Sequence, residues 1–258
     1  MAKVNTRKAF ETNVAPPSYG HRAQAVTAGG FLFTGGVIGV PFDEAAPGGE
    51  RQLPDDLATQ VGLCLRHMDA VTDAIGGEGG RVVEVSAFVA GPDGRQQVEA
   101  SLREFLGQAP PLLHYQAVED VAMHGLIEAD WIVVMDPAIS LPEAVDMIRP
   151  LGDLGTGEQV VTTGRFAITN GVFGHGPTMT EATENAIGTI AARLSTVGLG
   201  LDSIAKMVVY IDAFDRYPEF NDVTKQLLDL KPLPTRSVLV APQVTGAAAV
   251  RIDLIAEL

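Results

Sequence analysis

The chain has 258 residues, of which 46% are hydrophobic and 19% are charged. This composition excludes a disordered and a fibrous protein, and the length suits one large domain or two smaller ones. The net charge of −14 argues against nucleic acids and anionic membrane surfaces as partners, because both carry negative phosphate groups.

The sequence also limits targeting and metal binding. No apolar run approaches the length of a membrane span, and the basic start lacks the apolar stretch of a signal peptide. We therefore expect a cytoplasmic protein. Cys64 is the only cysteine, which excludes an intrachain disulfide and a paired-cysteine metal site. The histidines are scattered without metal-ligand spacing, so we predict no metal and no cofactor.

Two stretches of the chain are alike, since residues 31–39 read FLFTGGVIG and residues 166–174 read FAITNGVFG. In the first half, the periodicity then predicts a helix, a strand, a second helix and a last strand, over 57–75, 84–90, 98–106 and 131–135. The second half repeats this order over 186–197, 206–212, 220–228 and 250–256. Each half reads β-β-α-β-α-β, with room for one further short strand. We predict an α+β fold of two tandem domains, each a β-sheet with two helices packed on one face.

The composition also predicts the domain boundaries. Residues 1–136 form a first, diverged domain and residues 158–258 a second one. The linker 137–157 is rich in proline, glycine and aspartate, and it has room for at most one short helix, starting near Pro142. The loop 40–56 has no counterpart in the second half. We interpret it as an exposed insertion, with a lid as the alternative.

The second half carries a recognisable pattern. Residues 234–238 read PTRSV, residues 210–221 before them read YIDAFDRYPEFN, and Arg251 on the last strand lies 15 residues after Arg236. This resembles the YjgF/RidA family, also called L-PSP-type endoribonucleases, over nearly the whole chain as two tandem copies. The resemblance implies chorismate-mutase-like domains, trimers with pockets between subunits, and hydrolysis of reactive enamines and imines. We expect a trimer of tandem chains, with pairing of the two copies inside one chain as the alternative.

The resemblance implies that neither copy has a complete catalytic site. In the family, an arginine of the PxRS motif holds the substrate carboxylate, and a glutamate 15 residues further on activates water. The second copy has Arg236, but Arg251 stands at the glutamate position. The first copy has Glu128, but Leu113 stands at the arginine position. Because the resemblance places both groups on one subunit, we expect Glu128 to serve a different pocket from Arg236.

Matching the family's pocket positions to this sequence predicts further residues of the Arg236 pocket. Asn221 and Asn170 would hydrogen-bond the ligand. Arg251 would be a second cation, which suits a dicarboxylate or a phosphate. An intramolecular salt bridge for Arg236 and a solvent-exposed Arg251 are the alternatives.

Applying the family pattern to the first copy predicts a second set of site residues. Glu128 begins a very apolar strand, where burial would suit it to general acid or base catalysis. The resemblance places Glu99 and His114 close to Glu128, and it places Arg22 at the position of a pocket tyrosine. An acid beside a histidine can move protons. The alternatives are a solvated Glu128 and a surface His114.

Three functions follow from these observations. The first is a diverged enzyme that hydrolyses or tautomerises an imine, enamine or enol on a small carboxylate-bearing metabolite, in general or specialised metabolism. The second is a binding or scaffold protein whose sites have decayed. The third is an endoribonuclease, which the net charge of −14 disfavours.

Overall fold

The computed structural model describes residues 6–43, 52–91, 93–153, 160–229, 231–241, 244 and 248–258. Residues 44–51 of the loop 40–56 and residues 154–157 of the predicted linker lie outside the described residues. Within the described part, no helix combines the length and hydropathy that spanning a bilayer requires.

The first domain is a seven-stranded sheet with two helices on one face. Its strands are β1 (Lys8–Phe10), β2 (Ala25–Ala28), β3 (Phe31–Thr34), β4 (Val37–Ile38), β5 (Arg81–Ala90), β6 (Leu112–Val118) and β7 (Ile127–Val134). Its helices are α1 (Leu57–Ala74) and α2 (Arg95–Leu106), with a 3₁₀ turn, η1 (Ala122–His124). The strand order is β1-β2-β3-β7-β5-β6, and β4 also pairs with β7. The strand β6 runs parallel to β5 and forms one edge of the sheet.

The second domain is a five-stranded sheet of the same design. Its strands are β8 (Val161–Thr163), β9 (Phe166–His175), β10 (Ile204–Ile211), β11 (Thr235–Val240) and β12 (Ala248–Glu257). Its helices are α5 (Met179–Ser195) and α6 (Tyr217–Leu227), with 3₁₀ turns η2 (Leu201–Ser203) and η3 (Phe214–Arg216). The order is β11-β10-β12-β9-β8, and β11 runs parallel to β10 at the edge.

The predicted α+β repeat is confirmed. The order β5-α2-β6-β7 of the first domain returns as β10-α6-β11-β12 in the second, and β6 and β11 are the further strands that the sequence allowed. The first long helix of each domain begins at a side-chain cap, because Asp56 and Thr178 accept from backbone N–H groups of the first turn. The apolar side of each helix pair is buried against its own sheet.

The linker contains two helices, so the prediction of at most one was wrong. They are α3 (Leu141–Ile148) and α4 (Pro150–Asp153). The Ser140 side chain caps α3, and Pro142 occupies its first turn, where a missing N–H costs nothing. Ala144 and Ile148 of α3 are fully buried in a core cluster that also contains residues of both sheets. The linker is therefore part of the interface between the domains.

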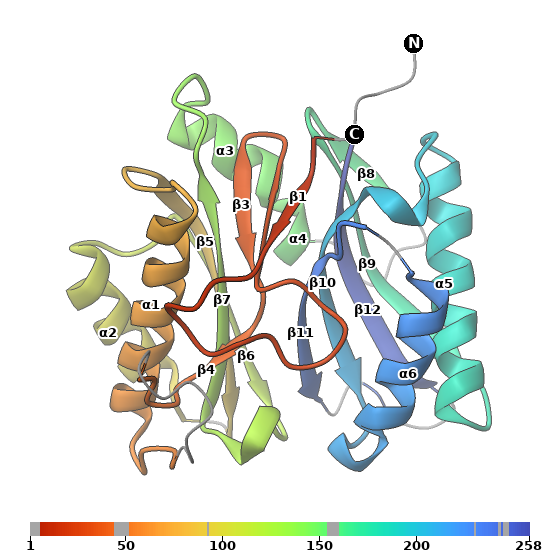
Figure 1. Cartoon of the computed structure of the whole chain (residues 1–258), viewed down its shortest axis with the longest axis horizontal. Coiled ribbons are helices and arrows are strands. Elements are labelled where there is room, and N and C mark those ends of the chain that lie inside the picture. Colours follow the sequence, from red (N-terminus) through yellow and green to blue (C-terminus); the bar gives the residue numbers. More distant parts are fainter. Residues whose placement is uncertain are drawn as a thin grey trace.

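The two sheets face each other within one chain. Figure 1 shows them side by side in the centre, with α1 and α2 outside the first sheet and α5 and α6 outside the second. Phe31 and Phe33 of the first sheet pack edge-on against Phe166 of the second, at ring distances of 5.2 and 5.6 Å. Single β-bridges join Ala23 to Thr235 and Asp120 to Val240. This is the alternative arrangement predicted from the repeat, in which the copies pair inside the chain.

The pairing is reciprocal. Ser237 of β11 donates to Asp130 of β7 across the interface, at 2.5 Å. The repeat counterparts of these two residues are His114 of β6 and Asp253 of β12, and Asp253 lies close enough to His114 to act on its pKa. Such i-to-j and j-to-i contacts are typical of a closed two-fold pair. Each domain therefore supplies one half of two equivalent regions of the interface, one beside Arg236 and one beside Leu113, and we call these regions the Arg236 cleft and the second cleft.

Candidate active site

Arg236 is a buried cation at the edge of the second sheet. Its side chain lies on the helix-covered face of β11, and only 2% of the residue is exposed. The guanidinium donates to Thr224 Oγ1 at 3.1 Å, to the Tyr217 hydroxyl at 3.0 Å and to Asn221 Oδ1 at 2.8 Å. All three acceptors are neutral and come from α6. Among the described residues no carboxylate pairs with Arg236, and its Nε has no hydrogen-bond partner.

The surroundings of Arg236 favour the binding of an anion. Burial lowers the pKa of Arg236, which shows that the charged form is poorly solvated. The rings of Tyr217 and Phe220 lie 5.8 and 5.3 Å from the guanidinium carbon and offer only weak cation–π stabilisation. A buried charge without a partner is costly, and a ligand carboxylate would offset that cost through two parallel hydrogen bonds. The intramolecular salt bridge considered for Arg236 is not found among the described residues.

Glu128 is a buried acid at the start of β7. It is 4% exposed, and its Oε1 accepts from the backbone N–H of Val238 on β11, at 3.2 Å. Burial raises the pKa of Glu128 to about 7, against the opposing effects of Arg22 and the Val238 N–H. A carboxyl group with such a pKa can both accept and return a proton near neutral pH.

The packing of the domains brings Glu128 to the strand that carries Arg236. Val238, which donates to Glu128, lies two residues after Arg236 on β11, and Glu128 acts on the pKa of Arg236. Arg22 joins the two, because its guanidinium donates to the carbonyls of Arg236 and Gly36 at 3.2 and 2.9 Å. The sequence assigned Glu128 to a different pocket, whereas the structure brings its carboxyl group against the strand that carries Arg236.

Gly36 lies closely against Glu128 and the strand β11. Its backbone N–H donates to the Arg236 carbonyl at 3.2 Å. A Cβ atom at this position would collide with the Glu128 carboxylate and lie 2.8 Å from Ser237 Oγ.

A short segment before β2 covers Arg236. The Tyr19 ring stacks on Tyr217 with centroids 5.7 Å apart, and the His21 N–H donates to Asn221 at 2.8 Å. Gly20 lies between them with φ at +82°, and a Cβ there would collide with the Tyr217 hydroxyl. Tyr19 itself is 73% exposed. A ligand reaches Arg236 only if this segment moves.

A comparison with known protein families identifies the family of this chain. The profile described as Endoribonuclease L-PSP matches the chain twice, over residues 12–135 and 152–258. The chain belongs to the L-PSP endoribonuclease family. Both domains are therefore L-PSP domains, and the Arg236 cleft lies between them.

Several solved structures are similar to one half of this L-PSP protein. RidA of the Antarctic bacterium Psychrobacter is 20% identical, with 49% of this chain and 98% of RidA covered and a TM-score of 0.43. The YjgF gene product of E. coli is 24% identical, with 49% and 98% covered and a TM-score of 0.42. E. coli TdcF, solved with bound serine, is 22% identical, with 49% and 98% covered and a TM-score of 0.42. The comparison with curated proteins finds no match.

Arg251 does not join Arg236 in this L-PSP chain, so the predicted two-cation pocket was wrong. The Arg251 guanidinium pairs with Asp253 at 2.9 Å and lies 4.9 Å from the Tyr210 ring. These residues belong to the inner face of the second sheet, whereas Arg236 lies on the helix side of β11. The partner of Arg251 is the acid two residues along the same strand.

Three further predicted site residues lie elsewhere than expected, since Glu99 and His114 lie away from Glu128 and Asn170 lies away from Arg236. Glu99 is on the surface of α2, where it pairs with Arg95 at 2.9 Å. The Asn170 amide donates to the linker carbonyls of Pro150 and Leu151 at 3.1 and 2.7 Å. His114 faces the second cleft, where burial lowers its pKa and the nearby Asp253 opposes that effect. The acid–histidine group expected around Glu128 is therefore not formed.

A buried charged cluster lies between the two L-PSP domains, and we call its members Glu84, Asp130, Lys206 and Ser237 the interdomain cluster. The Lys206 ammonium group pairs with Asp130 at 2.7 Å, and both side chains are almost fully buried. Ser237 donates to the other Asp130 oxygen. Burial raises the pKa of Glu84, and the neighbouring Asp130 adds to this shift. Among the described residues, no group of three or more potential ligands could hold a metal ion.

Proposed function

We propose that the chain is a hydrolase, of deaminase or tautomerase character, that acts on an imine, enamine or enol of a small carboxylate-bearing metabolite. Arg236 anchors the substrate carboxylate, and Glu128 is the general acid and base in the same cleft. The observation that carries this proposal is the buried Arg236 guanidinium without an ion pair among the described residues, on a strand that also contacts Glu128.

The chemistry needs one proton acceptor and one fixed substrate. With the carboxylate held by Arg236, ionised Glu128 takes a proton from water as the water oxygen bonds to the imine carbon. The same proton then passes to the nitrogen, which gives a carbinolamine. Glu128 next takes the hydroxyl proton of this intermediate and delivers it to the nitrogen, the carbon–nitrogen bond breaks as the carbon–oxygen double bond forms, and ammonia leaves with a 2-oxo acid remaining. A pKa of about 7 suits Glu128 to both transfers.

The other residues of the cleft position these two groups. Asn221 and Tyr217 hold the Arg236 guanidinium from one side, at 2.8 and 3.0 Å, and leave its Nε edge without a partner. Arg22 ties the Arg236 carbonyl to Gly36 and stabilises the ionised form of Glu128. The Tyr19–His21 segment would close over a bound substrate and exclude water other than the reacting molecule.

A non-catalytic binding protein would use Arg236 in the same way, and an endoribonuclease would need a basic surface for the phosphate backbone. No observation favours either function. The cytoplasmic location stays a prediction of the sequence.

The test is ammonia release from an imine generated in the assay from threonine, such as 2-iminobutyrate. Wild type should accelerate release over the spontaneous reaction. Glu128→Gln should lower the rate by about a hundredfold or more, which is the usual range for a general base. Arg236→Ala should raise KM, because it removes the carboxylate anchor.

The matched control is Glu99→Gln, which changes an acid on the surface of α2 outside the cleft. It should leave the rate unchanged. Equal rates for wild type, Glu128→Gln and the spontaneous reaction would exclude the hydrolase, and ligand binding that depends on Arg236 would then indicate a binding protein.

A further inference from the structure

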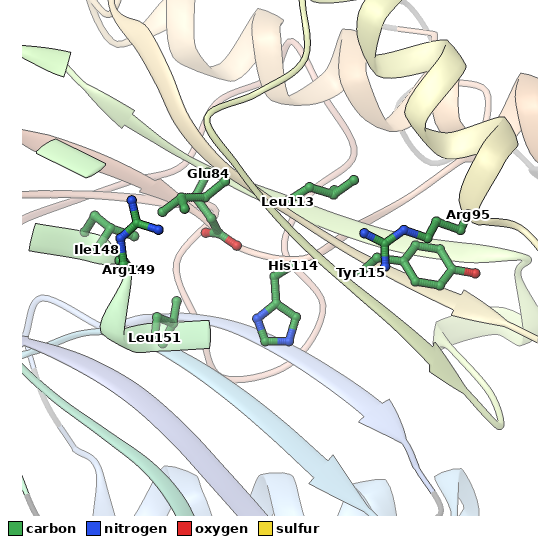
Figure 2. Close-up of a pocket in the computed structure, with 9 residues that line it drawn as sticks. Glu84, Arg95, Leu113, His114, Tyr115, Ile148, Arg149 and Leu151 are labelled. Carbon is green, nitrogen blue, oxygen red and sulfur yellow. The ribbon is translucent and has the colours of Figure 1, made fainter. Parts of the chain in front are cut away.

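The second cleft contains a cavity of its own. It has a volume of about 270 Å³ and lies at the edge strand β6, where the repeat places Leu113 at the position of Arg236. Figure 2 shows that side chains of β5, α2, β6 and the linker surround it. This cavity is separate from the Arg236 cleft, since none of its lining residues contacts Arg236.

We propose that this cavity is a second ligand site, for a small 2-oxo carboxylate with a branched apolar arm, in which Arg149 of the linker supplies the cation that Leu113 cannot.

Arg149 is held at the cavity by the linker. It directly follows α3 and lines the cavity, its side chain is exposed, and among the described residues it has no ion pair. The two residues after it are fixed to the second sheet, because the Asn170 amide donates to the carbonyls of Pro150 and Leu151. The turn that carries Arg149 is therefore rigid, although the residue itself reaches solvent. A guanidinium in this position can pair with a carboxylate without first breaking another ion pair.

The polar floor of the cavity is Glu84 with His114. Glu84 is 3% exposed; its Oε1 accepts from Ser86 at 2.7 Å, and within the described part of the chain its Oε2 has no hydrogen-bond partner. Ser86 pairs with His114 in the parallel β5–β6 ladder, so all three side chains share the inner face of the sheet. Figure 2 shows the Glu84 carboxyl group and the His114 ring facing the same space. Buried polar atoms in proteins are almost always hydrogen-bonded, so the Glu84 Oε2 atom is a candidate partner for a ligand atom.

The protonated form of Glu84 would donate to a ligand oxygen, and a ketone oxygen next to a carboxylate is such an acceptor. Burial favours this form, because it raises the pKa of Glu84.

Arg95 and Tyr115 also line the cavity, with Arg95 paired to Glu99 at 2.9 Å, and the rest of the wall is apolar and limits the size of the ligand. Leu113, Ile148 and Leu151 line the cavity beside the polar floor. A volume of about 270 Å³ holds about nine groups of the size of a water molecule, at about 30 Å³ each. The acid 4-methyl-2-oxopentanoate has a carboxylate, a ketone oxygen and a branched arm within this size, so it is the probe.

The test is calorimetric titration of 4-methyl-2-oxopentanoate into the whole chain carrying Arg236→Ala, which removes the anchor of the first cleft. Binding should persist in this protein. Adding Arg149→Ala should weaken it by about ten- to a hundredfold, because a charge-assisted hydrogen bond is lost. The matched control is Arg103→Ala on α2, since Arg103 is also exposed and does not line the cavity. It should leave binding unchanged.

Two further probes test the chemistry of the ligand. The amide of the same acid lacks the charge and should bind no better to the Arg149-containing protein than to the Arg149→Ala variant. The analogue 4-methylpentanoate lacks the ketone oxygen and should bind several-fold more weakly than the 2-oxo acid.

Two results would overturn the proposal. One is an absence of binding at about 10 mM acid, which corresponds to an affinity too weak for a specific site. The other is binding that Arg149→Ala leaves unchanged. Crystals of the wild-type chain soaked in the same acid answer the question without any variant. Density between Arg149 and Glu84 supports the second site, and density beside Arg236 alone contradicts it. Because the Arg236→Ala protein lacks the proposed active site, failure of one proposal leaves the other standing.

Discussion

Replacing Glu128 by glutamine should stabilise the fold above neutral pH. Burial raises the pKa of Glu128 from its ordinary value of 4.5 to about 7. Below pH 4.5 the carboxyl group is protonated in both the folded and the unfolded chain, so its titration costs nothing. Between the two values folding takes up a proton, and the free energy of unfolding therefore falls as the pH rises. Above about pH 7 the folded chain holds a buried carboxylate, and the cost is complete.

The size of this cost follows from the pKa shift. A rise from 4.5 to about 7, at about 1.4 kcal/mol for each pKa unit, is about 3 kcal/mol. Glutamine has the same shape, and its carbonyl oxygen can still accept from the Val238 N–H. The variant should therefore gain about 3 kcal/mol over wild type above pH 7, and little of this gain at low pH. The gain in stability would accompany the loss of activity.

The measurement is urea unfolding of both proteins at about pH 5 and about pH 8, followed by circular dichroism. Glu184→Gln is the control, since Glu184 is exposed on α5. It should give the same free energy of unfolding as wild type at both pH values. A Glu128→Gln variant that is no more stable than wild type at pH 8, or equally stabilised at both pH values, would show that Glu128 is not a buried carboxylate.

Three further predictions follow from the same structure. The rate of imine hydrolysis should rise with pH through about 7, because Glu128 must be ionised to accept a proton from water; a pH-independent rate would exclude this base. Gly20→Ala should lower the melting temperature more than Gly79→Ala. Both glycines have a similar positive φ, but only at Gly20 would a Cβ meet Tyr217 and Arg236, whereas at Gly79 nothing lies within 4 Å. Light scattering should give the mass of one chain, 27.2 kDa, because each domain already completes the other's clefts; a mass three times larger would support the trimer.

The fold could be predicted because its signals are local. A helical or alternating pattern of apolar residues needs only neighbouring positions, and the repeat doubled each signal. The second linker helix, α4, was missed because it has only four residues, and its proline and glycine are typical of a loop.

The site could be predicted only in part. The family resemblance identified Arg236 and Glu128 as two candidate groups, but which domain completes which cleft depends on contacts between sheets that no local pattern encodes. The pairing of Arg251 with Asp253 had a usable signal, because residues two apart on a strand share a face. Asn170 had none, since its partners are backbone carbonyls of the linker. Tyr217 and Thr224 were missed because helical spacing alone does not show which residues reach the edge strand.

The interdomain cluster has a consequence for which of the two repeated domains can pair with each other. Glu84 and Lys206 occupy the same position in the two repeats, yet they carry opposite charges. In the chain, Lys206 of one copy neutralises Asp130 of the other. Two first copies from different molecules would instead bring buried carboxyl groups together with no ammonium group between them, which is strongly unfavourable. The charge difference thus disfavours pairing between the first domains of two chains and favours the pairing of a first domain with a second one.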